Sequence, residues 1–282
     1  MNHIFDEIAN EIEEYKKAQK KWLRIWRHRY EPILFSILRE RYGHIFQKHW
    51  NSCVIPSQSN KAFVLVERRC HPNLEFVLHN IAYFGSGWSI YLFCSKENEQ
   101  FCKEILARHK LSIHLIPIFE KDVSMEEGIR EYNQLLQEQS FWKQIEAEHL
   151  CMMEMDCYLR KEIPEELLDY DYVGTPWGWD LKSPGGSGLT LRRRSAMLAI
   201  CGSCKKMEMQ DSFVAQGVVD LKLNWLPAKP YGVSTFVESF FTEDPVGVHQ
   251  WWTFVFNRYL NNQTLDIVRE YLTLELSKDG SN

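Results

Sequence analysis

Short apolar runs alternate with helical patterns from residue 60 to residue 156, and this alternation limits the fold more than any other feature of the chain. The runs are Ala62–Val66, Trp88–Phe93, Leu111–Ile116 and the segment that leads into Glu154, each with the length of a strand buried on both faces. Apolar residues at helical spacing occupy the intervals 71–84, 97–108, 126–136 and 141–148. This order predicts an α/β fold with a mainly parallel sheet flanked by helices.

Two acids end the fourth predicted strand. In an extended segment Glu154 and Asp156 point to the same side, because they are two residues apart. Paired carboxylates are costly to bury unless a cation neutralises them, and oxygen ligands suit Mg²⁺ or Mn²⁺. Ligands bind beyond the carboxyl ends of parallel strands, so residues 67–69, after the first strand, would border the same crevice. The alternative interpretation is a solvated strand end without a metal.

Length and composition set broader limits. The chain of 282 residues is long enough for one large domain, or for a domain with an appendage. Its formal net charge of -5 gives no general case for nucleic-acid binding. Its eight cysteines show no disulfide framework, so we expect a reducing, cytoplasmic compartment. We expect neither a secretory leader nor a membrane-spanning segment, because the N-terminus is acidic and no apolar stretch is long enough.

Residues 1–56 are predicted to form a helical extension before a domain at 57–282. Apolar residues recur at helical spacing up to Pro32, which is predicted to start or break a helix. Lysines and arginines in this extension are interleaved with Trp22 and Trp26. The pattern favours packing on the main domain or on a second copy, and contact with a membrane surface or an acidic partner is the alternative.

The second half of the chain is less regular. A glycine-rich turn at 184–188 lets the backbone approach a ligand closely, but it lacks the ending of a P-loop. Cys201 and Cys204 form a C-x-x-C motif without a second pair at usable spacing, which disfavours a zinc or redox role. A predicted short strand runs into His249, and a helix is predicted around 257–276.

Eight stretches stand in order over residues 60–252. They are FVLVERR at 63–69, HPNLEF at 71–76, ENEQF at 97–101, YNQLL at 132–136, EMD at 154–156, YDYVGTPW at 170–177, GLTLRRRSAM at 188–197 and PVGVH at 245–249. The ordered set resembles the GT-A class of glycosyltransferases, and more closely a glycosyltransferase-like domain family of bacteria and large viruses. The resemblance implies a Rossmann-like GT-A fold. It also implies transfer of a sugar from a nucleotide-sugar donor, typically a UDP-sugar, to a glycan or other hydroxyl acceptor.

The resemblance further implies a metal site and a nucleotide site. In GT-A enzymes the last acid of a D-x-D-like motif holds Mn²⁺ or Mg²⁺, which implies Asp156 as the ligand. Glu154 would then contact the ribose or lie in the outer coordination shell of the metal, although the first position of the motif is normally an aspartate. His249 matches the position of a further metal ligand. Nucleotide contacts are implied at Glu67, Arg68, Arg69 and Asn133. A surface salt bridge is the alternative for the two arginines.

A catalytic base and an acceptor site follow from the same resemblance. Inverting GT-A enzymes place an aspartate at the start of a late helix, and Asp211 lies in the matching interval. Gln210 stands where the family has an acid, and Asp211 has the alternative role of N-cap for a helix over 212–219. Contacts to the acceptor or sugar are implied at Trp177, Gly186, Ser187 and Gly188. A buried aromatic is the alternative for the tryptophan.

We therefore expect a metal-dependent glycosyltransferase that inverts the anomeric carbon, because one carboxylate base favours single displacement. A module that binds nucleotide sugars without turnover is one alternative, and an assembly protein that works through its N-terminal helix is another. The expected partners are a nucleotide-sugar donor and a hydroxyl acceptor, without nucleic acid. The N-terminal helices would contact a second copy of the chain or the surface of a membrane.

Overall fold

The computed structural model describes residues 23–108, 113–120, 125–175, 177, 180, 182–186, 188–227, 235–238 and 245–250. Ser187 and the helix predicted at 257–276 lie outside these ranges. No helix in the described part of the chain is long and apolar enough to cross a membrane. All eight cysteines lie in that part and are free thiols.

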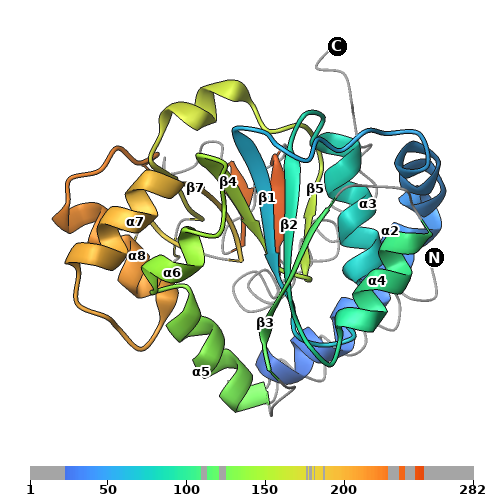
Figure 1. Ribbon diagram of the computed structural model, residues 1–282, viewed down its shortest axis with the longest axis horizontal. Helices are drawn as coiled ribbons and strands as arrows, with labels where there is room; N and C mark the ends of the chain where they lie inside the picture. The colour runs from blue at the N-terminus through green and yellow to red at the C-terminus, as the bar shows by residue number, and fades with distance from the viewer. Residues whose placement is uncertain are drawn as a thin grey trace, which may run out of the picture.

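A six-stranded sheet with the order β3-β2-β1-β4-β7-β6 forms the centre of the molecule (Figure 1). Its four parallel strands are β1 (Lys61–Val66), β2 (Ser89–Ser95), β3 (His114–Phe119) and β4 (His149–Met153). Strand β7 (Leu189–Arg193) pairs antiparallel with β4, and β6 (Tyr172–Val173) pairs antiparallel with β7 at the edge of the sheet. The prediction of a mixed, mainly parallel sheet flanked by helices is confirmed, and the arrangement is consistent with a Rossmann-like GT-A fold.

Helices cover both faces of this sheet (Figure 1). One side carries α2 (Leu23–Trp50), α3 (Leu74–Phe84) and α4 (Glu99–Ala107). The other carries α6 (Gln139–Trp142), α7 (Arg194–Ser203) and α8 (Gln210–Asp220), with α5 (Met125–Leu135) leading towards α6. The helix predicted over 141–148 is only four residues long, because the chain turns so that the Glu148 amide reaches the Asn60 carbonyl at 3.1 Å.

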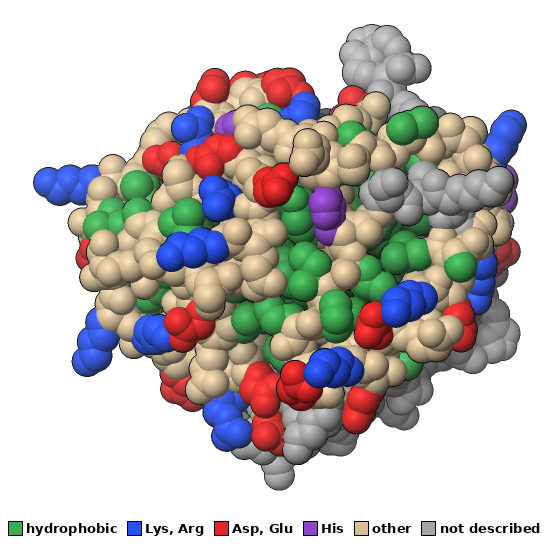
Figure 2. Space-filling model, viewed as in Figure 1, with side chains coloured by type: hydrophobic (Ala, Val, Ile, Leu, Met, Phe, Trp, Pro, Cys, Tyr) green, Lys and Arg blue, Asp and Glu red, His purple; other side chains and the backbone are tan. Residues whose placement is uncertain are grey.

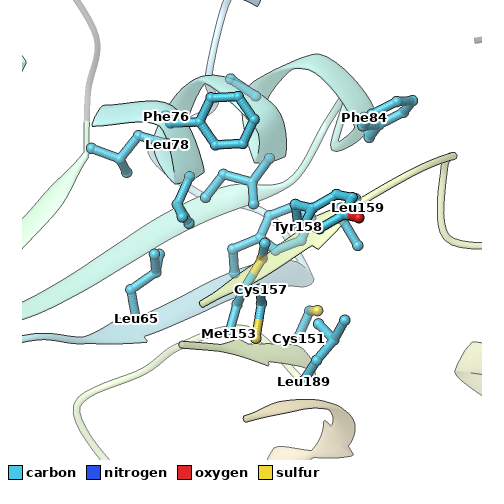
Figure 3. Close-up of a cluster of buried hydrophobic side chains, with 14 of the residues drawn as sticks. Leu65, Phe76, Leu78, Phe84, Cys151, Met153, Cys157, Tyr158, Leu159 and Leu189 are labelled. Atoms are coloured by element: carbon cyan, nitrogen blue, oxygen red, sulfur yellow. The ribbon is translucent and has the colours of Figure 1, made fainter. Parts of the chain in front are cut away.

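Alternate residues of each strand point to opposite faces of the sheet and so belong to two different cores. Phe63 and Leu65 of β1 join the core beneath α2 and α3, whereas Ala62 and Val64 join the core beneath α6, α7 and α8. Figure 3 shows the first core, where Phe76 and Phe84 of α3 lie opposite Met153. Figure 2 shows hydrophobic side chains gathered in the middle of one face of the molecule, with charged side chains around them. Burial on both faces explains why β1, β2 and β4 are continuous apolar runs. Strand β3, at the edge of the sheet, is only partly buried, and it extends to Phe119, beyond its predicted end at Ile116.

The N-terminal helix differs from its prediction. Pro32 lies inside α2 and does not break it. A proline inside a helix costs about 3 kcal/mol, and the next turns offset this by burying Phe35, Leu38 and Phe46 in the core shared with α3. The division of the chain at residue 56 stays a prediction, although α2 contributes to the same core as the sheet.

A second, three-stranded sheet has the order β5-β9-β8. It consists of β5 (Cys157–Leu159), β9 (Gly247–His249) and β8 (Phe236–Val237), and a short 3₁₀ helix, η1 (Glu165–Asp169), follows β5. Cys157 stands opposite His249 in the antiparallel pair, and Val237 pairs with Val248 on the other side of β9. This small sheet brings the chain that follows β4 next to the much later segments 236–237 and 247–249.

Candidate active site

Two acids and a histidine meet where the two sheets join. The turn 154–156 follows β4, and β9 places His249 across from it. The Nε2 atom of His249 lies 3.3 Å from Oδ1 of Asp156 and 3.7 Å from Oε2 of Glu154. Asp156 and His249 are each only 3% exposed, whereas Glu154 is half-buried. Two groups that sequence analysis predicted as metal ligands are therefore in contact.

A third carboxylate meets the opposite side of the imidazole. Glu238 follows β8, and its Oε1 atom lies 3.3 Å from Nδ1 of His249. A carboxylate in this position orients a ligating histidine and increases its basicity. Burial lowers the pKa of His249, but Cys157, Asp156 and Glu238 raise it more, so the pKa stands well above its usual value. Sequence reasoning missed Glu238, although a short apolar run also leads into it.

The donor atoms fit a divalent cation. The ligand atoms of Asp156, Cys157 and His249 all lie within 4.8 Å of one another. Two ligands at right angles, each about 2.1 Å from one ion, are about 3 Å apart, close to the separation of the Asp156 and His249 atoms. Burial raises the pKa of the Cys157 thiol well above its usual value, and sulfur favours softer metals. Asp156 and His249 are therefore placed so that they could hold a divalent cation, and a thiolate ligand would favour Zn²⁺.

The residues after β1 separate into two groups. Glu67 is buried and holds Arg69 in a fork, with Nε–Oε1 and Nη2–Oε2 distances of 2.8 Å each. The hydrogen bond to Glu67 is the main cause that raises the pKa of Arg69, and Asp156 adds to the rise. Arg69 therefore lies within electrostatic reach of the metal-site acid. Arg68 turns instead to Glu131 at 2.7 Å and lies over the ring of Phe119.

Asp211 occupies the first turn of α8. The prediction that it is the N-cap is wrong, because Met209 holds that position and α8 begins at Gln210. Burial raises the pKa of Asp211 to about 6, and Glu154 and Glu238 act in the same direction against Arg192. The acid thus shares the electrostatic environment of Glu154 and of His249, which lowers its pKa. A carboxyl group that titrates near neutrality suits a general base.

Gln210 joins this acid to a buried arginine. Its Oε1 atom accepts hydrogen bonds from Nη1 and Nη2 of Arg192, each at 3.2 Å, and its Nε2 atom donates to Asp211. Its backbone amide donates to Oδ1 of Asn133 at 2.7 Å, which fixes the start of α8. Asn133 therefore supports α8 here, and a direct contact with a nucleotide stays a prediction. Sequence reasoning gave no role to Arg192, because a side chain in a basic triplet is usually solvated.

The glycine-rich segment at 184–188 runs close to Asp211 and to Glu154. A Cβ atom on Gly186 would lie 2.9 Å from Cβ of Asp211, and one on Gly188 would lie 2.7 Å from Cδ of Glu154 and 2.8 Å from Nε2 of His249. The indole of Trp177 donates to the Gly186 carbonyl at 3.0 Å. The structure brings Gly186 and Gly188 to the acids, while Ser187 lies outside the described residues.

Tyr132 is a further residue of this cluster that sequence reasoning left without a role. Burial is the main cause that raises the pKa of its hydroxyl, and a hydrogen bond with Glu154 contributes to the rise. A cavity of about 400 Å³ beside Lys205 and Phe213 includes none of the residues named in this cluster.

A family described as "Protein of unknown function (DUF5672)" matches residues 116–264, which is more than half of the chain. The chain belongs to this family. The matched range contains every site residue named above except those that follow β1. No curated protein matches the sequence.

Two solved structures are similar in fold. The 4-diphosphocytidyl-2C-methyl-D-erythritol synthase of Anaerococcus prevotii is 12% identical, with a TM-score of 0.39, over 59% of this chain and 85% of its own. The apo form of glycosyltransferase GlyE from Streptococcus pneumoniae is 10% identical, with a TM-score of 0.46, over 77% of this chain and 64% of its own. At this similarity the two structures do not bear on the chemistry of the site.

Proposed function

We propose that this chain is a metal-dependent glycosyltransferase that moves a sugar from a nucleotide-sugar donor to a hydroxyl acceptor. The observation that carries the proposal is the meeting of two units at one edge of a parallel sheet. One unit is the Asp156–His249 pair with Glu238 behind it, and the other is Asp211 with its raised pKa. A cation site beside a titratable carboxyl is what transfer from a diphosphate to a hydroxyl requires.

Each unit has a defined part in this chemistry. Mn²⁺ or Mg²⁺ held by Asp156 and His249 supplies a Lewis acid that neutralises charge on the departing nucleoside diphosphate. Arg69 uses Nε and Nη2 for Glu67, so its Nη1 group can donate to a phosphate oxygen. Asp211 takes the proton of the acceptor hydroxyl. A single base of this kind leads to inversion at the anomeric carbon.

Release of nucleoside diphosphate tests the proposal. Purified protein is incubated with Mn²⁺ and a panel of UDP- and GDP-sugars, with and without simple glycan acceptors, and chelator serves as the blank. We expect metal-dependent release from one donor. Asp156→Asn should abolish it, and Asp211→Asn should reduce it by about a hundredfold or more while donor binding persists. Asp220→Asn, an exposed acid at the other end of α8, is the matched control.

The outcomes separate the proposal from its alternatives. Donor binding without release, unchanged in Asp211→Asn, would indicate a nucleotide-sugar-binding module. No metal-dependent binding of any donor would reject the glycosyltransferase assignment. Where a product forms, proton NMR of its anomeric signal decides the stereochemistry, and an α-linked product from an α-linked donor contradicts inversion.

A further inference from the structure

The turn that carries Asp156 is attached to α3 at both ends. Nδ2 of Asn73 donates to the carbonyl of Met155, the residue between the two acids, at 3.1 Å. Asn80, two turns further along the same face of α3, donates to the Leu159 carbonyl at 2.9 Å and accepts from the Leu159 amide at 2.7 Å. Asn73 is 2% exposed and Asn80 is fully buried. The segment 155–159 is therefore fixed from the helix side.

Asn73 makes this contact instead of capping its own helix. It occupies the N-cap of α3, where an asparagine normally accepts a hydrogen bond from the second or third helical amide. No such side-chain bond is present. A missing cap costs about 1 kcal/mol, so the side chain is not placed for the stability of α3. Its side chain is instead oriented to donate a hydrogen bond to the carbonyl of Met155.

Helix α2 holds Asn73 in this orientation. Oε1 of Glu31 accepts a hydrogen bond from Nδ2 of Asn73 at 2.9 Å, and the guanidinium of Arg39 donates to Oδ1. Arg39 also donates to the Pro72 carbonyl at 3.0 Å. Both hydrogens of the amide and its oxygen are thus occupied, so the amide cannot rotate without breaking a bond to α2.

An aromatic contact also connects α2 with this segment. The ring of Phe35 packs edge-on against Tyr158, with ring centroids 6.3 Å apart, two residues after Asp156. Helix α2 therefore meets the segment 155–159 directly through this ring pair and indirectly through Asn73.

We propose that Asn73 is a positioning residue for Asp156, and that Glu31 and Arg39 of α2 keep it in place. Helix α2 then supports the active site in addition to its part in the core. The inference rests on the proposed function, in which Asp156 holds the cation. Contacts that orient a metal ligand from outside change metal affinity by about 10- to 100-fold.

Two measurements on Asn73→Ala test the proposal. Hydrogen exchange followed by mass spectrometry reports the mobility of peptide 154–159, where the Cys157 amide donates to the Glu154 carbonyl at 3.1 Å. Titration with Mn²⁺ alone, followed by the EPR signal of the free ion, reports affinity. We expect faster exchange in this peptide and about tenfold weaker Mn²⁺ binding. Ile81→Val, a loss of one methyl in the core of the same helix, is the control for general destabilisation.

A pair of changes at Glu31 keeps the test valid if Asn73→Ala does not fold. Glu31→Gln retains an oxygen acceptor for Asn73 and should leave exchange in peptide 154–159 unchanged, whereas Glu31→Ala removes it and should increase exchange. Equal exchange of this peptide in wild type, Asn73→Ala and Ile81→Val, or equal exchange in both Glu31 variants, overturns the positioning role. Unaltered Mn²⁺ binding in Asp156→Ala instead overturns the metal site, and the exchange measurement still decides the role of Asn73.

Discussion

At the scale of single residues, Asp211 is held in a state that is unfavourable for folding. Its carboxyl is desolvated and lies near Glu154 and Glu238, and Arg192 offsets these effects only in part. The folded state therefore binds the proton more tightly than the unfolded chain does. Residues with strained electrostatics of this kind are typical of functional sites.

Asp211→Asn should stabilise the folded protein at neutral pH. The wild-type pKa is about 6 against an ordinary value of 3.8, so the penalty on folding is absent below pH 3.8, grows between pH 3.8 and 6 and is complete above pH 6. Two pH units correspond to about 2–3 kcal/mol. Thermal unfolding at pH 8 and pH 4 measures the effect, and the variant should melt higher than wild type only at pH 8. An equal difference at both values would remove the electrostatic explanation.

Gly188→Ala should damage the metal site. The new methyl group would lie under 3 Å from Cδ of Glu154 and from Nε2 of His249, and the buried imidazole cannot move aside easily. We expect at least a tenfold loss of Mn²⁺ affinity and a loss of about 1–3 kcal/mol of stability. Gly43→Ala is the control, because its nearest atom is 3.9 Å away in α2 and it should be neutral or stabilising. Mn²⁺ titration and denaturant unfolding of both variants measure these effects.

At the scale of elements, the small second sheet assembles the site. Strand β9 has only three residues, yet its register sets Cys157 opposite His249 and thereby brings the histidine to Asp156. A slip of one residue would turn the imidazole to the other face. Strand β8 holds β9 from its other side and is followed directly by Glu238. The site therefore depends on two very short strands paired in one register.

Removal of the charge on Glu238 should weaken metal binding through His249. Glu238→Gln keeps the shape and an oxygen near Nδ1 but loses the negative charge that favours a basic imidazole. We expect about tenfold weaker Mn²⁺ binding in the same titration. Glu166→Gln, an exposed acid in η1, should bind as wild type does. Wild-type affinity in Glu238→Gln would mean that Glu238 does not support the ligand.

Strands that are long and buried could be predicted from the sequence, whereas very short strands could not. Strands β1 to β4 are long apolar runs with helices on both sides, so the sequence pattern indicated each of them and the sheet type. Strands β5 and β8 have three and two residues, too few for a period to be visible. Glu238 was missed for this reason, whereas His249 was found through the resemblance.

At the scale of the whole molecule, contacts distant in sequence decide what local patterns cannot. Pro32 was predicted to start or break a helix, but packing of the following turns on α3 keeps α2 continuous. Arg192 was given no role of its own from the sequence, and it is buried against Gln210 and Thr190. Residues 67–69 and the acids Glu154 and Asp156 were predicted to border one crevice, and β1 and β4, which precede them, are parallel neighbours in the sheet. Their roles stay proposals.

Helix α2 should contribute to global stability, in contrast to a detachable appendage. Phe46 is 1% exposed and packs on Phe76, Tyr83 and Phe84 of α3, whereas its neighbour Ile45 is 40% exposed. Phe46→Ala should lower the free energy of unfolding by about 3–5 kcal/mol, because it leaves a cavity in the shared core. Ile45→Ala should change it by less than about 0.5 kcal/mol. Denaturant unfolding gives both values, and one cooperative transition is expected in each case. An early separate transition in Phe46→Ala, with the sheet still folded, would show that α2 is an independent unit.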